Sequence, residues 1–443
     1  MKNIYIFRND LRLLDNETLF RALAKSETLI LIYILEKRLQ GKTHFGFDKT
    51  GSYRAKFLKE SVENLSNRIK EKGGKLLLAK GEYLPIVDLI SENIDIDQIY
   101  VTAEYHSEEI ESISTLKEKF QVTEVHNLTA LHPSNLPFSD SSEIPDQFTA
   151  WRKKTEKQLT IRSVRPEPDS LIKSDIVLNK LTNKQDAEFF DNVDNLFEEL
   201  VKEDKVIDDN TAFPFGGGES EAFNRVEYYI NNSRIIESYA DTRNGLIGKD
   251  YSTKFSPWLA NGSISSRYIY NKVLDYESEY RSNDSTYKVK FELLWRDYFK
   301  FLSMKYGDKI FYRSGLYGKE YDHTLVMQSF EKWKTGETGD PFVDANMKEL
   351  NATGWMSNRG RQNVASYLTK DMGVDWRLGA EYFESLLLDY DTASNYCNWQ
   401  YQAGVGVDSR PNRKFNTKLQ AERYDPYGKY QNLWLGKEAN RIV

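Results

Sequence analysis

The chain has little cysteine and histidine and no long apolar run. Its 443 residues include one cysteine, Cys397, and five histidines. One thiol cannot close an internal disulfide, which excludes a disulfide-stapled secreted domain and is typical of a reducing compartment. No His/Cys grouping has metal-ligand spacing, so we expect no metal site. The N-terminus shows no signal-peptide pattern and no apolar run has membrane-spanning length, so we expect a cytoplasmic protein.

The chain also lacks a positive net charge and the common glycine-rich phosphate motifs. Its formal net charge is −6, which excludes a generally basic nucleic-acid binder and requires any DNA contact to use a local basic groove. The turn after the first predicted strand, Arg8–Arg12, contains no glycine, so the dinucleotide-binding fingerprint is absent. A P-loop and a nucleophile elbow are missing as well.

Two domains are expected because the chain is too long for one ordinary core. Its first part alternates apolar runs at 4–7, 29–35, 75–79, 98–102 and 122–125 with amphipathic stretches. This alternation predicts a parallel sheet covered on both faces, a Rossmann-like α/β domain at residues 1–130. Residues 131–218 are predicted to be a linker with one short helix within 146–156. Residues 219–443 have helical periodicity, and Ser220 is a candidate N-cap for the first helix.

Two segments of the helical part carry polar groups in patterns that suit a ligand. Tyr239 precedes the stretch Ser252–Ser256, whose hydroxyl and cationic side chains come just before Pro257. Such a helix start binds phosphate well, although a simple N-cap with proline in the first turn explains the same residues. In the second segment, Glu292 and Arg296 are four residues apart and either pair on a helix surface or form the wall of a ligand site.

The most informative stretch is Thr353–Tyr401, which combines charges with three tryptophans, Trp355, Trp376 and Trp399. Arginine and aspartate are rarely buried unless paired. We expect Arg361 to point inward toward Asp389 or Asp391, while Arg359 points outward. A structural salt bridge would account for that pair, but the cluster favours a large planar polar ligand such as a flavin.

Taken in order, several segments resemble the photolyase/cryptochrome family, and most of all its DASH branch. They are RNDLRLLDN, DYSTKFSPWLANG, FELLWRDYFKF and LLLDYDTASNYCNWQYQAGVG, and the similarity extends over essentially the whole chain. The resemblance implies an α/β antenna domain, a linker and an all-α C-terminal domain that binds a folded FAD. The implied FAD contacts are Tyr239, Ser252, Thr253, Lys254, Phe255, Ser256, Glu292, Arg296, Arg361, Asp389, Asp391 and Asn395.

The resemblance also implies an activity. Reduced FAD would donate an electron in blue light to a cyclobutane pyrimidine dimer, preferentially in single-stranded DNA. The residues implied in this chemistry are Glu292, Asn358, Asn395, Trp399 and Trp376. Those implied in DNA binding are Arg243, Trp295, Arg359, Gln362, Tyr401 and Arg413. A folate antenna, methenyltetrahydrofolate, is expected near Glu108 and Glu109, although these could equally be the charged first turn of a helix.

The sequence departs from the family at one position and leaves one alternative open. The family's outer electron-transfer tryptophan would lie ten residues before Trp333, where this chain has His323. Because imidazole is much harder to oxidise than indole, we expect slow photoreduction or a route through Tyr321 or Tyr317. The alternative is a blue-light receptor that uses the same FAD for signalling. The chain's end at Val443, without a long extension, favours repair, and we expect a monomer with no membrane partner.

Overall fold

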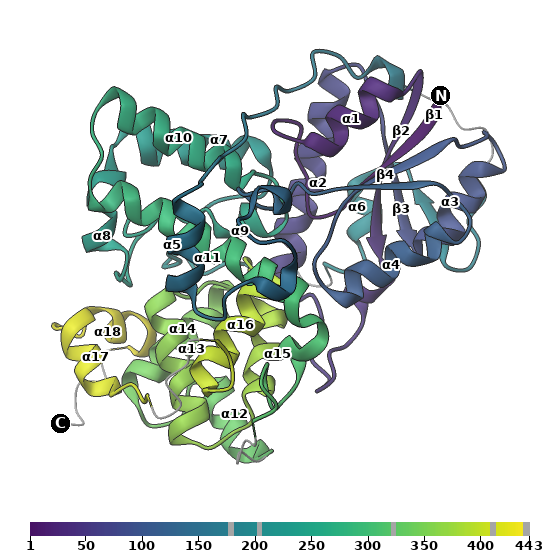
Figure 1. Ribbon diagram of the computed structural model, residues 1–443. Coiled ribbons are helices and arrows are strands. Elements are labelled where there is room, and N and C mark those ends of the chain that lie inside the picture. The colour runs from purple at the N-terminus through teal and green to yellow at the C-terminus, as the bar shows by residue number, and fades with distance from the viewer. Residues whose placement is uncertain (176–180, 202–205, 320–324, 408–412, 437–443) are drawn as a thin grey trace.

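The computed structural model describes residues 1–443 except 176–180, 202–205, 320–324, 408–412 and 437–443. The N-terminal part is a six-stranded sheet of order β5-β4-β1-β2-β3-β6 (Figure 1). Five strands are parallel: β1 (Lys2–Phe7), β2 (Thr28–Glu36), β3 (Leu76–Gly81), β4 (Gln98–Thr102) and β5 (Val122–Val125). All five strands predicted from the sequence are therefore confirmed. Their continuous apolar runs are what a parallel sheet requires, because both of its faces are covered.

Alternate residues of the strands build two separate cores. Tyr5 and Phe7 point to the face covered by α1 (Glu17–Lys25), α2 (Ser52–Glu71) and α6 (Val193–Phe197). Ile4 and Ile6 point to the opposite face, covered by α3 (Tyr83–Ser91) and α4 (Ser107–Lys117). The period of two in the strand side chains produces this division.

The segment predicted to be a linker contains more structure than expected. Its short helix, α5 (Phe148–Glu156), begins within the predicted range, but the second helix, α6, and the strand β6 (Ala187–Phe190) were not predicted. This strand pairs antiparallel with β3 at the edge of the sheet. Its four residues are too few to show an alternation of apolar and polar positions, and only Ala187 is buried.

The remaining chain is helical, as predicted. Its α-helices are α7 (Glu219–Glu227), α8 (Tyr239–Thr242), α9 (Ser256–Ala260), α10 (Ser266–Glu279), α11 (Asp284–Tyr306), α12 (Met327–Thr335), α13 (Pro341–Thr353), α14 (Asn358–Ser366), α15 (Trp376–Leu386), α16 (Thr392–Ala403), α17 (Thr417–Tyr424) and α18 (Lys429–Leu435). No helix in the described part of the chain is long and apolar enough to cross a bilayer.

The predicted cap of α7 is wrong. Ser220 lies inside the helix, the cap position is Gly218 with φ of 99°, and the Ser220 hydroxyl accepts a hydrogen bond from Asn64 at 3.0 Å. Beside it, the buried Glu219 carboxylate accepts the backbone N–H groups of Leu13 and Leu14, each at 2.9 Å. The start of α7 therefore anchors the α/β domain instead of being capped by its own serine.

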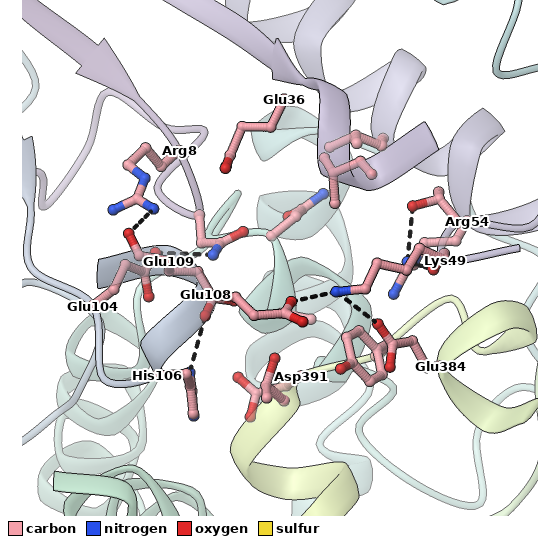
Figure 2. Close-up of a pocket in the computed structure, with 18 of the residues that line it drawn as sticks. Arg8, Glu36, Lys49, Arg54, Glu104, His106, Glu108, Glu109, Glu384 and Asp391 are labelled. Atoms are coloured by element: carbon pink, nitrogen blue, oxygen red, sulfur yellow. Dashed lines mark hydrogen bonds and ion pairs between the residues drawn. The ribbon is translucent and has the colours of Figure 1, made fainter. Parts of the chain in front are cut away.

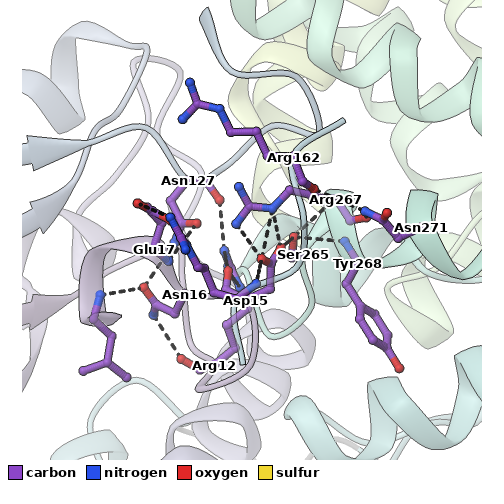
Figure 3. Close-up of polar contacts among 12 residues, drawn as sticks. Arg12, Asp15, Asn16, Glu17, Asn127, Arg162, Ser265, Arg267, Tyr268 and Asn271 are labelled. Carbon is purple, nitrogen blue, oxygen red and sulfur yellow. Dashed lines mark hydrogen bonds and ion pairs between the residues drawn. The ribbon is translucent and has the colours of Figure 1, made fainter. Parts of the chain in front are cut away.

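A buried polar cluster joins the α/β and helical parts (Figure 3). Asp15 accepts hydrogen bonds from Arg267 (2.5 Å from Nη2 to Oδ1) and Ser265 (2.5 Å) on the helical side. Arg12, 2% exposed, donates to the carbonyl oxygens of Gly262 at 3.0 Å and Asn127 at 2.9 Å. A broken buried pair costs about 3–5 kcal/mol, so these contacts hold the two parts in one relative orientation.

Candidate functional site

The helical part encloses a large cavity of about 480 Å³, which is within the usual range for a small-molecule site. Its walls come from α8, the 251–256 loop, α11, α14 and α16. Every residue implied in FAD binding lines it except Asn395. Residues implied in catalysis or DNA binding also line it: Arg243, Trp295, Asn358, Gln362 and Tyr401.

The inward Arg361 and its carboxylate lie where the sequence predicts them. Arg361 Nη2 donates to both oxygens of Asp389, at 2.9 and 3.0 Å, and its Nε donates to the carbonyl of Met356 at 2.9 Å. The hydroxyl of Ser256 donates to Asp389 at 2.7 Å. One carboxylate thus ties together α14, the start of α9 and the segment before α16. The pair offers a fixed cation without adding net charge to the cavity wall.

The 251–256 loop is held in shape from beneath. Arg225 donates to the carbonyl of Thr253 at 3.0 Å and to that of Ser252 at 3.1 Å. Lys254 has a left-handed backbone with φ of 62°. The simple N-cap alternative for this loop holds in part: Pro257 does lie in the first turn of α9, but Phe255 occupies the cap position without a side-chain cap and Ser256 bonds to Asp389.

Lys254 provides a test of whether an anionic group fits this cavity. Its ammonium is buried against the ring of Tyr251, 3.3 Å from the centroid, and that of Trp355, 4.6 Å away, and lacks a hydrogen-bond partner among the described residues. Burial lowers the pKa of Lys254 well below its usual value. Glu349 and Asp389 are the carboxylates that act on Lys254, and a phosphate-bearing ligand in the cavity would add a further negative charge near it.

The charged residues that α11 contributes to the cavity do not form the surface pair Glu292–Arg296. Glu292 forms its ion pair with Arg243, and Lys288 lies 3.5 Å away, so the Glu292–Arg296 pair is wrong. Arg296 instead donates to two backbone carbonyls, of Leu128 at 2.6 Å and Leu259 at 2.9 Å. Because its donors are used by the backbone, Arg296 supports the wall. Helix periodicity alone could not show that these longer-range partners win.

Aromatic and basic groups surround the opening of the cavity. Trp295 stacks on Phe148 of α5, with ring centroids 3.7 Å apart. Arg413 donates to the Tyr401 hydroxyl at 3.3 Å. Arg359 bonds to Gln362 at 3.0 Å and to Asn244 at 2.9 Å.

The positive charge at this opening includes an arginine that the sequence did not single out. Burial lowers the pKa of Arg359, and the neighbouring charges of Arg243, Arg423 and Arg413 lower it further. Arg423 lies in α17. This protein of negative net charge therefore has a local basic rim, the arrangement that DNA contact would require.

A recess of about 100 Å³ opens from the same wall and contains Asn395 and Trp399. Asn395 Nδ2 donates to the carbonyl of Ala380 at 3.0 Å, which leaves its carbonyl oxygen for a ligand. Trp399 packs on Gly379 of α15, where an added Cβ would come within 2.2 Å of the indole. Trp376 is fully buried and lines neither space; its Nε1 bonds to the carbonyl of Arg313 at 3.1 Å. His323 and Tyr321 lie outside the described residues.

A second cavity, of about 120 Å³, lies between the α/β and helical parts (Figure 2). Glu108 and Glu109 both line it. Glu108 forms an ion pair with Lys49, and the buried Glu109 lies 3.7 Å from His106, which lowers the pKa of Glu109. Burial raises the pKa of Glu104, on the same wall, to about 7. The pKa values of carboxyl groups on this wall are therefore shifted in opposite directions.

The two cavities share a wall that the sequence did not reveal. Asp391 lines both, caps α16 by accepting the N–H of Ser394 at 2.9 Å, and forms an ion pair with Lys300 at 2.8 Å. That cation and Arg296 lower the pKa of Asp391 well below its usual range. Lys300 is one turn from Arg296 on α11, and this spacing was the only signal for it in the sequence.

Comparison with known families matches this arrangement. Residues 3–170 match the model of DNA photolyase, and residues 289–441 match the FAD binding domain of DNA photolyase. A Cryptochrome DASH of Xenopus laevis is 45% identical over 98% of this chain and 82% of its own. The chain belongs to the photolyase/cryptochrome family.

Solved structures of the family have the same fold. A Synechocystis cryptochrome superposes with a TM-score of 0.91 at 41% identity, over 99% of this chain and 89% of that one. A class III photolyase from Agrobacterium tumefaciens gives 0.83 at 26% identity, over 98% and 86%. The relatives make this chain a DASH-type cryptochrome/photolyase, and the family model identifies its helical part as an FAD-binding domain.

Proposed function

We propose that this protein splits cyclobutane pyrimidine dimers in light, preferentially in single-stranded DNA. The observation that supports this most is one continuous cavity with two kinds of wall. Deep inside are the Arg361–Asp389 pair and the buried Lys254, and at the opening are Glu292, Trp295 and the basic rim. A cofactor and a base can therefore meet in one enclosed space. We also propose that the protein acts as a monomer in the cytoplasm.

In this proposal FAD occupies the deep part, where the polar groups suit it. When bound and reduced, FAD supplies in blue light one electron that the dimer later returns, so that two C–C bonds break with no net oxidation. The residues of the chain position the groups and set the charge. Arg361 places a cation at the ring system, and Asp389 prevents that cation from being an unpaired buried charge. Asn395 offers its free amide oxygen from the recess.

The opening would bind the flipped lesion. Enzymes that act on a base, photolyases included, extrude it from the stack, which costs a few kcal/mol and least in a single strand. Trp295 offers a ring face, and Tyr401 and Gln362 offer polar edges beside it. Arg243, Arg359 and Arg413 would contact backbone phosphates. Arg243 is already paired with Glu292, so the DNA phosphate and this carboxylate compete for one guanidinium.

The test is a light-dependent repair assay on single- and double-stranded oligonucleotides that carry one dimer. We expect light-dependent repair, faster on the single strand, and a loss of repair in Glu292→Gln. Glu279→Gln, which changes an exposed glutamate at the end of α10, serves as the matched control and should repair as the wild type does. FAD binding without repair of either strand would refute the proposal and favour the receptor.

We further propose that the second cavity holds a folate antenna. The carboxylates of Glu108, Glu109 and Glu104 can accept hydrogen bonds from the amino groups of a pterin. At about 120 Å³ the cavity takes only part of a folate, and the rest would lie at its open side. Addition of methenyltetrahydrofolate should give a bound near-ultraviolet absorber, and Glu109→Gln should weaken its binding. Unchanged binding in this variant would place the antenna elsewhere.

A further inference from the structure

Tyr396 is a buried phenol between a tryptophan of the implied electron route and a carboxylate. It lies on α16, 6% exposed, and its ring centroid is 6.2 Å from that of Trp376. The ring of Phe311 packs edge-on from another side at 4.7 Å. The Tyr396 hydroxyl donates to Glu384 Oε2 of α15 at 3.1 Å. The ring of Tyr396 thus packs against Trp376, while its hydroxyl binds Glu384.

Glu384 is placed to accept a proton. It is buried, lines the second cavity, and lies 4.0 Å from Lys49 (Figure 2). Burial raises its pKa, and the charges of Arg54 and Lys49 act against that rise. A raised pKa makes a carboxylate a stronger base, and a position on the cavity wall gives the proton a way out.

Another phenol of this core, Tyr382, differs in its partner. Tyr382 lies beside Trp333, with ring centroids 6.1 Å apart, and its hydroxyl donates to the amide oxygen of Asn351 at 2.6 Å. An amide oxygen is a hydrogen-bond acceptor but a very weak base. Of these two tyrosines, only Tyr396 can lose its proton to its hydrogen-bond partner as it loses an electron.

We propose that Tyr396 is an electron donor to Trp376 and that Glu384 takes its proton. The inference rests on the flavin site of the proposed function, because the light-excited oxidised flavin is the oxidant that takes one electron from the tryptophans. Trp376 then regains one electron from Tyr396. The phenol O–H bond breaks, the proton moves to Glu384 Oε2, and a neutral tyrosyl radical faces a neutral carboxylic acid. A soluble thiol later returns the electron, and Glu384 returns the proton.

The experiment uses the full chain loaded with oxidised FAD and illuminated with a thiol present. Electron paramagnetic resonance should detect a tyrosyl radical in the wild type, and infrared difference spectra should show a carboxylic acid formed in light. Tyr396→Phe should lose both signals. Glu384→Gln should slow radical formation by about 100-fold or more, the low end for a positioned base. Tyr382→Phe removes a hydroxyl from the same core and should keep both signals.

The outcomes separate this inference from the repair proposal. A wild type without a tyrosyl radical, or a Tyr396→Phe variant that keeps it, would overturn the inference. If Tyr317→Phe loses the radical and Tyr396→Phe keeps it, the electron donor is Tyr317. Repair by chemically pre-reduced protein does not need Tyr396, so Tyr396→Phe should then repair normally. If Tyr396→Phe lacks the radical as expected, but neither the wild type nor pre-reduced protein repairs dimers, only the repair proposal is refuted.

Discussion

The Arg361–Asp389 pair makes a quantitative prediction for Asp389→Asn. The wild-type carboxylate is almost fully buried, with 4% of its side chain exposed, and Arg361 is 24% exposed. The substitution leaves the shape but removes the charge that balances Arg361. It also turns one hydrogen-bond acceptor into a donor that faces the donors of Arg361 and Ser256.

The magnitude follows from burial. Breaking a fully buried pair costs about 3–5 kcal/mol. Water at the partly exposed guanidinium recovers some of this, so we expect about 2–3 kcal/mol. For a domain of some 150–250 residues, this corresponds to a fall in melting temperature of roughly 5–10 °C. FAD affinity should fall as well, because Arg361 is no longer held in place, and each 1.4 kcal/mol lost is about tenfold in Kd.

The assay is calorimetric melting at pH 7 and FAD titration of wild type, Asp389→Asn and Ser256→Ala. Asp308→Asn, at an exposed aspartate, is the matched control and should melt with the wild type. Ser256→Ala alone should cost about 1 kcal/mol and almost nothing when Asp389→Asn is already present, because the hydroxyl has then lost its charged partner. A melting temperature of Asp389→Asn within about 1 °C of wild type would refute the reasoning.

Three further substitutions test buried groups. Lys254→Met should stabilise the FAD-free protein by about 1–3 kcal/mol, because it removes an unpartnered ammonium. Since the pKa of Lys254 is lowered on folding, wild-type stability rises with pH toward the unfolded value, and melting of the variant should lose that rise. Glu349→Gln keeps the hydrogen bond from Tyr430; burial raises the pKa of Glu349 to about 7, so the variant should lose the fall in stability from about pH 4 to 7 in the same melts. Gly379→Ala should displace Trp399 and cost about 1–3 kcal/mol, visible as altered tryptophan fluorescence and a lower melting temperature.

The sheet and the flavin clamp could be predicted from the sequence because each follows from a local or chemically forced rule. Apolar runs such as that of β2 have few alternatives to a buried parallel strand. An inward-pointing Arg361 requires a carboxylate, and the cluster that includes Asp389 and Asp391 supplied the candidates. The structure selects Asp389.

Other features could not be predicted because their partners are far apart in the sequence. Asp15 and Arg267 are separated by more than half the chain, and nothing local marks either as paired. Glu292 does not pair with Arg296; it pairs with Arg243, 49 residues away, and with Lys288 one turn earlier. β6 is too short to carry a periodic signal. Local patterns show which residues are unusual, and long-range packing decides their partners.

The same long-range pairing fixes the walls of the cavity. If the walls were apolar, they would gain free energy by moving together, because side chains that face a void lose dispersion contacts. Here several charged wall residues are tied to other elements: Glu292 to α8–α9 through Arg243, and Arg296 to the carbonyl of Leu128. Asp391 is held by Lys300 of α11. Because these groups are already paired, collapse would break charge-assisted bonds of about 1.5–3 kcal/mol each. The polar pairs therefore keep the cavity preformed for its cofactor.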